Sequence, residues 1–392
     1  MDIFQKCYEF QDDEALADRG LYPFFLPLTE NEGTVASYKG KKLIMCGSNN
    51  YLGLTAHPKV REAAIDAIRK YGTSCTGSRF LNGSLELHET LEHELADFVG
   101  KEAALVFSTG MQVNLGTISS LVGKGDYAIL DKEAHASIYD GVRLSYGKLE
   151  RFNHNDMAHL ERVMASIPED AGKLVVVDGL FSMGGDLAPL DQIVPIVKKY
   201  KARLMVDDAH GIGVTGKGFG TSAQFGLTDE VDLIMSTFSK SFASLGGFIS
   251  GKSEVINFVK HFSRSLIFSA SVQPASAAAA LASLRIMRDE PQWNARLMVI
   301  AEKMRNGLKQ LGFNIGNTVS PIIPVIIGDN EMTFKMARDL FDRGVFVNSV
   351  IAPAAPVGSQ MLRTSYMATH TDEQLDKVLE IFEVVGKLNG LI

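Results

Sequence analysis

The sequence predicts an α/β protein in which a mostly parallel sheet lies between helices, followed by a smaller α+β domain. Two observations indicate this fold class. Between residues 104 and 249, short runs rich in Val, Ile and Leu alternate with helical stretches, and strands that are apolar on both faces are typical of parallel sheets covered by helices. From about residue 275 the regular alternation of short strands and helices ends, because an Ala-rich segment leads into longer helices and isolated strands.

The elements of the large domain follow from local patterns. The clearest helix is 58–71, because Val60, Ala64 and Ala67 share one stripe, Pro58 stands at a natural first position and Gly72 ends the helix. The expected strands are 104–107, 127–130, 174–177, 204–206, 233–235 and 248–249, with helices at 157–167 and 190–200 between them. Sheets of this kind bind ligands at the carboxyl ends of their strands.

The rest of the chain predicts a different organisation. Its expected elements are a helix at 296–311, a strand at 322–327, a helix at 332–343, strands at 345–350 and 361–365, and a helix at 372–388. We therefore divide the chain into an N-terminal segment 1–56, a large domain 57–280 and a C-terminal α+β domain 281–392.

Composition excludes several classes of protein. The 392 residues are 46% hydrophobic and 22% charged, which excludes disorder, and a net charge of −7 argues against a nucleic-acid partner. No apolar run is long enough for a membrane span, and the acidic start is unlike a signal peptide. The three cysteines are Cys7, Cys46 and Cys75, and their small number and wide spacing fit a reducing compartment. We expect a cytoplasmic protein.

Two motifs mislead when they are read alone. Residues 211–216 match G-x-G-x-x-G, but no helix follows at once and Gly218 replaces the Ser or Thr of a P-loop, so we interpret them as a glycine-rich loop. His88 and His93 lie five residues apart, where four is needed to share a helix face, so we assign no metal and interpret both as solvated surface residues.

The candidate catalytic residues follow two of the predicted strands. One apolar strand is followed by Asp207, Asp208 and His210, and the next ends in hydroxyl residues around Lys240. Each alone has an ordinary explanation, a loop hydrogen bond or a surface lysine. Together they supply what pyridoxal 5′-phosphate (PLP) requires, which is a lysine for a Schiff base and an acid for the pyridine nitrogen. Ser-Thr-Gly-Met at 108–111 supplies donors for its phosphate.

Motifs along nearly the whole chain resemble the α-oxoamine synthase family of PLP enzymes. They are Ser-Asn-Asn-Tyr-Leu-Gly-Leu at 48–54, Gly-Ser-Arg-Phe-Leu-Asn-Gly at 77–83, Glu-Ala-His-Ala-Ser at 133–137, Phe-Ser-Met at 181–183, Asp-Asp-Ala-His-Gly at 207–211, Thr-Phe-Ser-Lys-Ser at 237–241, Phe-Ser-Ala-Ser at 268–271, and Arg363 before Met-Ala-Thr-His-Thr at 367–371. The resemblance implies fold type I of the PLP-dependent transferases, with a seven-stranded sheet.

The resemblance also implies roles for individual residues. Lys240 would bind the cofactor and move the substrate Cα proton, Asp207 would face the pyridine nitrogen, His210 the phenolic oxygen, and His135 would stack on the ring with Ser182 nearby. The phosphate would be held by Thr109, Gly110, Met111 and Thr237, and by Ser269 and Ser271 from the neighbouring subunit of a homodimer. Arg363 would bind the amino-acid carboxylate, and Asn49 would lie at the substrate entrance.

The implied reaction is a decarboxylative condensation of a small amino acid with an acyl thioester, carried by coenzyme A or by an acyl carrier protein. The motifs look most like the bacterial branch that joins serine to a palmitoyl-length chain, making a sphingolipid precursor. A lipid product would bring the dimer to the inner membrane face, although no long basic amphipathic helix is present to anchor it.

Three positions depart from that branch. Gly184 stands where an acid is usual, Ser236 where glycine is usual, and Ser349 where proline is usual. If they approach the pocket, they favour a more anionic amino acid such as L-cysteate, which would give a sulfonolipid precursor. The alternative explanation of the three departures is neutral drift outside the pocket. The alternative functions are condensation of alanine with pimeloyl thioester or of glycine with acetyl thioester, transamination, and a silent subunit of a heterodimer.

Overall fold

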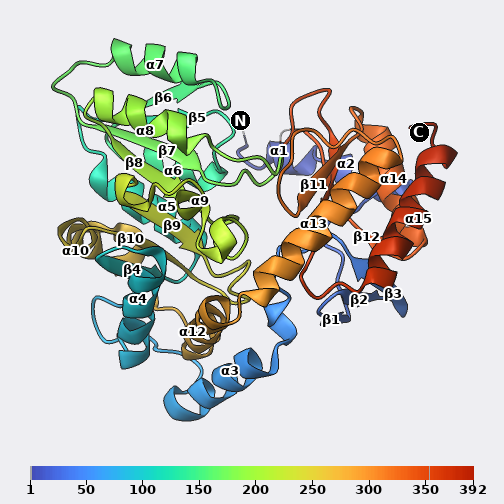
Figure 1. The fold of residues 1–392 in the computed structure, drawn as a ribbon, viewed down its shortest axis with the longest axis horizontal. Helices are drawn as coiled ribbons and strands as arrows, with labels where there is room; N and C mark the ends of the chain where they lie inside the picture. Colours follow the sequence, from blue (N-terminus) through green and yellow to red (C-terminus); the bar gives the residue numbers. More distant parts are fainter. Residues whose placement is uncertain (1, 353) are drawn as a thin grey trace.

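Two lobes make up the computed structural model of the chain, which describes residues 2–352 and 354–392. In Figure 1 the sheet of the larger lobe and its helices occupy one side, and the helices of the smaller lobe occupy the other. The long helix α13 (Gln292–Gln310) runs along the smaller lobe from the junction between them.

The larger lobe is built on a seven-stranded sheet. Its strands, in spatial order, are β4 (Ala103–Phe107), β10 (Gly247–Gly251), β9 (Leu233–Thr237), β8 (Arg203–Asp207), β7 (Lys173–Asp178), β5 (Tyr127–Asp131) and β6 (Lys148–Phe152). Six of the seven strands run in one direction, and β10, between β4 and β9, runs in the opposite direction. It follows β9 after the short loop 238–246 with no helix between, and such a loop can join antiparallel strands only. The predicted fold, a mostly parallel seven-stranded sheet, is confirmed.

Helices cover both faces of this sheet, which explains its continuously apolar strands. Leu174 and Val176 pack with helices on one face, and Val175 and Val177 pack with helices on the other. The first face is covered by α5 (Gly110–Leu121), α6 (Ala136–Arg143) and α10 (Ser253–Phe262), and the second by α4 (Glu86–Val99), α7 (Met157–Ser166), α8 (Leu190–Lys199) and α12 (Pro274–Asp289). Helix α3 (Pro58–Tyr71) has the predicted bounds and packs on α12.

The smaller lobe combines both ends of the chain. A three-stranded antiparallel sheet of β11 (Ile322–Ile326), β14 (Met361–Ser365) and β13 (Asn348–Val350) packs with α13, α14 (Asn330–Asp342) and α15 (Asp372–Leu388). A second sheet joins β1 (Glu30–Glu32), β2 (Val35–Tyr38) and β3 (Lys41–Met45) to β12 (Val345–Phe346). The short helices α1 (Gln5–Tyr8) and α2 (Asp12–Asp18) precede them.

Several expected boundaries differ from the observed ones. The division at residue 280 falls inside α12, and much of the segment 1–56 is paired with the C-terminal lobe through β3 and β12. The single strand expected at 345–350 is two strands in different sheets. Strand β6 was not predicted, because it is a sheet edge of sequence Lys-Leu-Glu-Arg-Phe and is largely exposed.

One interpretation of a residue was wrong. His88 is fully buried rather than solvated, because its Nδ1 accepts a hydrogen bond from the Leu85 amide at 3.2 Å and its Nε2 lies 3.1 Å from the Val272 carbonyl oxygen. Burial lowers its pKa. His93 is exposed, as expected.

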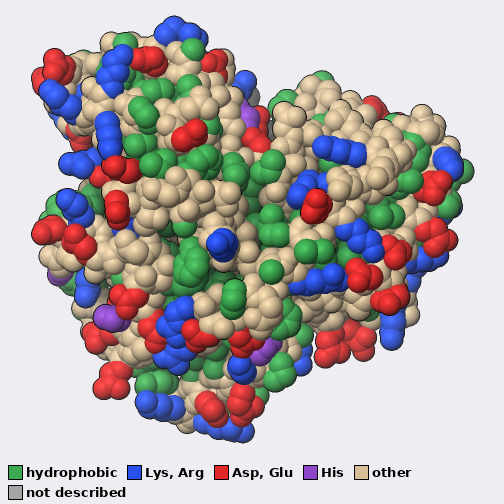
Figure 2. Space-filling view, viewed as in Figure 1, with side chains coloured by type: hydrophobic (Ala, Val, Ile, Leu, Met, Phe, Trp, Pro, Cys, Tyr) green, Lys and Arg blue, Asp and Glu red, His purple; other side chains and the backbone are tan. Residues whose placement is uncertain are grey.

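Within residues 2–352 and 354–392, no helix is both long and apolar enough to cross a bilayer. Figure 2 shows charged side chains of both signs along the outer margin of one face, and hydrophobic side chains near the junction of the two lobes.

Candidate active site

A cavity of about 240 Å³ lies at the carboxyl ends of the parallel strands, as expected for this kind of sheet. It brings together eight of the predicted residues, Thr109, Gly110, Met111, His135, Asp207, His210, Thr237 and Lys240. Seven further residues line it that were not predicted, Asn114, Ser137, Asp178, Ala209, Met235, Ser239 and Leu245.

Lys240 is presented by the loop between β9 and β10. The loop is closed by hydrogen bonds from the Phe238 amide to the Gly246 carbonyl at 2.9 Å and from the Ser244 amide to the Phe238 carbonyl at 2.8 Å. The Phe238 side chain is fully buried and anchors the loop in the core. Burial lowers the pKa of Lys240 to about 8, although Asp207 and Asp178 act in the opposite direction. A neutral amine is therefore accessible near neutral pH.

Asp207 ends strand β8 and is buried. Its Oδ2 accepts a hydrogen bond from Asn114 Nδ2 at 2.7 Å, and its Oδ1 accepts one from the Ala209 amide at 3.1 Å. Asn114 lies within α5 and is also 2.8 Å from the Ser137 hydroxyl. These contacts fix the carboxylate at one orientation toward the cavity.

A second carboxyl group lies beside Asp207. Asp178 ends the neighbouring strand β7 in register with Asp207, so both side chains share one face of the sheet. Its Oδ1 accepts a hydrogen bond from the His135 amide at 3.1 Å. Burial and, secondly, the charge of Asp207 raise the pKa of Asp178 well above its usual range. The raised pKa favours the protonated, uncharged form of Asp178, which holds the backbone of His135.

This neutral state gives a testable prediction. Asp178→Asn keeps an uncharged acceptor for the His135 amide and should change the thermal unfolding temperature and cofactor affinity little. Asp178→Ala leaves that amide unpaired and should cost about 1–3 kcal/mol of unfolding free energy. Calorimetry of both variants measures the difference, and equal losses in the two variants would show that Asp178 is charged.

The predicted residues Asn49, Ser182 and Arg363 do not line the cavity, but they contact one another beside His210, which does. Arg363 on β14 donates from Nη2 to Asn49 Oδ1 at 3.0 Å and from Nε to the Ser182 carbonyl at 2.6 Å. The Tyr51 hydroxyl lies 3.4 Å from Nη2 and 2.6 Å from His210 Nδ1. Burial lowers the pKa of His210, so its imidazole is neutral. Within the described residues Arg363 Nη1 donates no hydrogen bond, which leaves it available to a carboxylate.

The N-terminus of α5 provides an anion cradle. Thr109 caps the helix, accepting the Gln112 amide on its hydroxyl at 3.1 Å, while the amides of Gly110 and Met111 have no acceptor within the described residues. A Cβ at Gly110 would lie 2.7 Å from the Thr237 Cβ and Oγ1 atoms, so only glycine fits here. Free amides at a helix N-terminus bind phosphate.

Gly110→Ala should therefore weaken cofactor binding. Relieving the clash with Thr237 costs about 1–3 kcal/mol. If that cost falls on the bound state, it corresponds to a roughly five- to 150-fold higher dissociation constant for PLP. Equilibrium dialysis measures it, with Gly123→Ala just beyond the other end of α5 as the matched control. Unchanged affinity in a folded Gly110→Ala variant would show that the phosphate does not bind at the N-terminus of α5.

Some predicted residues are not brought into the cavity. Ser236 is fully buried on the strand face opposite Met235 and Thr237, and its hydroxyl is 3.3 Å from the Asp208 carbonyl oxygen. Ser349 pairs with Leu362, whereas Arg363 pairs with Asn348, so Ser349 and Arg363 face opposite sides of the sheet. A Cβ at Gly184 would lie 2.4 Å from Asp186 Oδ1. Their assignment to the substrate pocket gains no support from these positions.

Ser269 and Ser271 lie near the start of α5 but have partners within the chain. Ser269 Oγ accepts a hydrogen bond from Gln112 Nε2 at 2.9 Å, and the Ser271 amide and hydroxyl both donate to the Gly77 carbonyl, at 2.9 and 3.1 Å. Phe268 beside them is 74% exposed. The segment is thus fixed in place at the surface.

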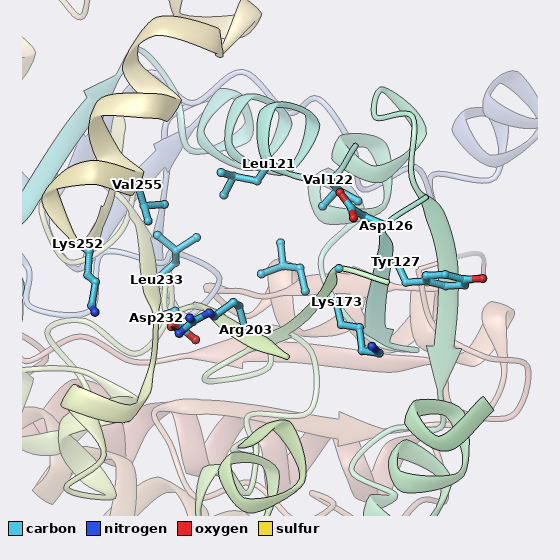
Figure 3. A pocket seen from close by; sticks show the side chains of 12 residues that line it. Leu121, Val122, Asp126, Tyr127, Lys173, Arg203, Asp232, Leu233, Lys252 and Val255 are labelled. Atoms are coloured by element: carbon cyan, nitrogen blue, oxygen red, sulfur yellow. Dashed lines mark hydrogen bonds and ion pairs between the residues drawn. The ribbon is translucent and has the colours of Figure 1, made fainter. Parts of the chain in front are cut away.

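A second cavity, of about 330 Å³, lies at the opposite edge of the sheet. Figure 3 shows Leu121, Val122, Leu233 and Val255 around it, with Arg203 and Lys252 at its margin. It opens at the amino ends of the strands, where such sheets do not position catalytic groups, and none of the predicted site residues lines it. The smaller cavity around Lys240 is therefore the candidate active site.

The residues of that cavity fit PLP. Lys240 lies in one cavity with Asp207, which can meet the pyridine nitrogen, and the free amides of α5 can meet the phosphate. Fold and site together define a PLP-dependent enzyme of fold type I.

Comparison with known proteins gives the family. The aminotransferase class I and II family matches residues 41–382. A serine palmitoyltransferase from Sphingobacterium spiritivorum is 50% identical over 96% of this chain and 95% of its own, and an 8-amino-7-oxononanoate synthase from Alkaliphilus oremlandii is 41% identical over 97% and 96%. A solved structure of SPT with PLP as an internal aldimine superposes with a TM-score of 0.97 at 38% identity, covering 100% of both chains. The chain belongs to the α-oxoamine synthase family of PLP-dependent acyltransferases, and the resemblance seen in its motifs is confirmed.

Proposed function

We propose that this chain joins L-serine to a long-chain acyl thioester of about palmitoyl length, releasing CO₂ and a free thiol and forming a 3-ketosphinganine-type amino ketone. The observation that carries the proposal is the placement of Lys240 with Asp207 and the α5 cradle in one cavity, in a chain with relatives named serine palmitoyltransferase at 49–50% identity over nearly its full length.

The residues divide the work of binding. Bound PLP supplies an electron sink that acidifies the Cα proton of an amino acid and lets its carboxylate leave as CO₂. Thr109, Gly110, Met111 and Thr237 would hold its phosphate, Asp207 its ring nitrogen, and His135 one face of the ring. His210, kept neutral by burial and paired with Tyr51, would donate to or accept from the phenolic oxygen.

Proton transfer would be carried by Lys240. A pKa of about 8 gives its amine both protonation states near neutral pH, so it can take the Cα proton and return one later. Arg363 would bind the amino-acid carboxylate through Nη1, while Ser182 and Asn49 hold the rest of the guanidinium. Asn49 thus acts on the substrate side through Arg363.

Serine is favoured over L-cysteate because the reasons for cysteate weaken in the structure. Ser236 and Ser349 face away from the cavity and from Arg363, and Gly184 lies against Asp186. None of the three adds a positive charge that a sulfonate would need. Their departures from the serine-using branch are consistent with drift outside the pocket.

A panel of amino acids tests the proposal. The PLP-loaded chain is given serine, cysteate, alanine or glycine with palmitoyl-coenzyme A, and with pimeloyl- and acetyl-coenzyme A as matched acyl donors. Serine with the palmitoyl donor should exceed each other pair by about tenfold or more in kcat/KM. Preference for alanine with the pimeloyl donor would replace the proposal, as would preference for cysteate. Relatives at 41–42% identity are named 8-amino-7-oxononanoate synthase, one of them as putative.

Assembly as a homodimer belongs to the same proposal. Ser269 and Ser271 would reach the cofactor phosphate of the partner. Large exposed apolar side chains lie on the segments 77–83 and 268–271, which are joined by the Ser271–Gly77 hydrogen bonds, and at the start of α5. These are Phe80, Leu81, Met111 and Phe268, each at least half exposed. Sedimentation should give a dimer, and a fully active monomer would contradict it.

Contact with the inner face of a membrane would follow from a lipid product, and flotation with lipid vesicles tests it.

A further inference from the structure

A cluster of charged side chains lies outside the cavity. His154 Nδ1 is 3.0 Å from Asp131 Oδ1, and His154 Nε2 is 2.9 Å from Asp186 Oδ2 and 3.9 Å from Glu133 Oε2. Burial is the largest influence and opposes the charge, but hydrogen bonds to Asp131 and Asp186 overcome it and raise the pKa of His154 to about 10. The imidazolium therefore bridges two carboxylates at neutral pH.

The bridge joins the segments that follow three neighbouring strands. Asp131 ends β5, His154 follows β6, and Asp186 belongs to the hairpin 179–188 that follows β7. Asn155 reinforces the joint, because its amide donates to Asp131 Oδ2 at 3.0 Å and its Nδ2 donates to Asp186 Oδ2 at 3.0 Å. Asn155 adopts a positive φ of 51° to make these contacts.

The hairpin in turn contacts the smaller lobe. It is closed by the Phe181 amide donating to the Asp186 carbonyl at 2.9 Å, and the Phe181 ring meets the edge of His154 at 4.4 Å between centroids. The next residue, Ser182, accepts the Nε hydrogen of Arg363 at 2.6 Å. On its far side, the Gly185 carbonyl accepts the Val319 amide at 3.1 Å, and a Cβ at Gly185 would lie 2.3 Å from the Ile322 carbonyl oxygen.

We propose that His154 is a positioning residue for the amino-acid substrate: by bridging Asp131 and Asp186 it fixes the hairpin 179–188, and through the Ser182 carbonyl it sets the orientation of Arg363. The inference rests on the proposed function, since it assigns to Arg363 the substrate carboxylate. His154 does not line the cavity. His154, Asp131 and Asp186 all belong to the larger lobe, and their contacts reach Arg363 of the smaller lobe through the hairpin and the Ser182 carbonyl. The phosphate cradle on α5 lies outside this chain of contacts.

Removing the imidazolium leaves Asp131 and Asp186 facing one another without a cation. Two carboxylates in a partly buried site repel, so the hairpin shifts and carries the Ser182 carbonyl with it. A displacement of about 1 Å in a group that orients a substrate costs up to about 10²-fold. The loss should appear in amino-acid binding and not in the acyl donor or the cofactor.

The test compares His154→Gln with His93→Gln, a histidine on α4 that is 79% exposed and far from this joint in the chain. For His154→Gln we expect the KM for serine, and its dissociation constant from the spectral change on binding, to rise about tenfold or more. We expect kcat, the KM for palmitoyl-coenzyme A and the PLP dissociation constant to stay within about threefold of the wild type. His154→Gln/Asp186→Asn, which removes the unpaired charge, should recover most of the serine affinity.

Two outcomes would overturn the inference. One is unchanged serine affinity in folded His154→Gln, and the other is an equal loss in the PLP and acyl-donor constants, which would mean a general loss of structure. Failure of the proposed function is distinguishable, because the wild type itself would then not condense serine with the palmitoyl donor.

A measurement without substrate tests the bridge itself. The folded-state pKa of His154 is raised, so its contribution to stability is complete below its ordinary value near 6.5 and is lost as the pH rises toward 10. The wild type should lose unfolding free energy over this range, because deprotonated His154 no longer attracts the carboxylates that face it. These are Asp131, Glu133 and Asp186. This loss should be absent in His154→Gln. The same pH dependence in both proteins would show that a charged His154 does not bridge the two carboxylates.

Discussion

Lys240→Ala is expected to lower condensation turnover by about 10⁴-fold, the upper end of what a positioned acid–base group contributes. The amine that takes and returns the Cα proton is then missing, and the cofactor loses its covalent anchor. The visible absorption band of the PLP-loaded protein, which depends on the lysine linkage, should vanish. Absorption spectra and steady-state rates measure both effects.

The matched control for this prediction is Lys252→Ala, an exposed lysine at the margin of the cavity in Figure 3. Its spectrum and turnover should equal those of the wild type. If Lys240→Ala kept the visible band or retained more than about a tenth of the turnover, Lys240 would not be the lysine that binds the cofactor.

Asp207→Asn is expected to lower turnover by about 10³-fold, which is typical of removing one preorganised charge from a buried site. The amide cannot hold a proton on the pyridine nitrogen, so the electron sink weakens. The amide has one oxygen where the carboxylate has two, so it can accept from Asn114 Nδ2 or from the Ala209 amide but not from both. The donor left unpaired should cost about 1–3 kcal/mol of unfolding free energy.

Asp207→Glu separates charge from geometry. It keeps the carboxylate but moves it by one methylene, away from the hydrogen bonds with Asn114 and the Ala209 amide. Its turnover should lie between those of Asp207→Asn and the wild type. Equal turnover for Asp207→Asn and the wild type would contradict the assignment of Asp207 to the ring nitrogen.

Much of the fold could be predicted because its signals are local. Helix α3 is defined by Pro58 and Gly72 at its ends, and the buried strands are apolar on both faces. The sheet edge β6 and the split between β12 and β13 were missed because both depend on distant partners, β5 in one case and β3 in the other. Pairing at long range leaves no periodicity in a single segment.

The site residues that could be predicted are likewise those with a local signal in the sequence. Asp207, His210 and Lys240 were found because acids, a histidine and a lysine at strand ends suggest chemistry by residue type. Asp178 carried the same signal, an acid directly after the run 174–177, and could have been found by comparing strand ends. Asn114 and His154 could not, because a mid-helix asparagine and a loop histidine acquire their roles only through contacts with Asp207 and Asp186.

The stoichiometry of the products distinguishes decarboxylative condensation from the other reactions of PLP enzymes. The PLP-loaded chain is incubated with serine labelled in its carboxyl carbon and with palmitoyl-coenzyme A, and labelled CO₂, free thiol and long-chain amino ketone are measured together. The proposed function predicts the three products in equal amounts, and about 10⁴-fold less of each in Lys240→Ala. Formation of a keto acid from serine without CO₂ or thiol would indicate transamination and contradict the account.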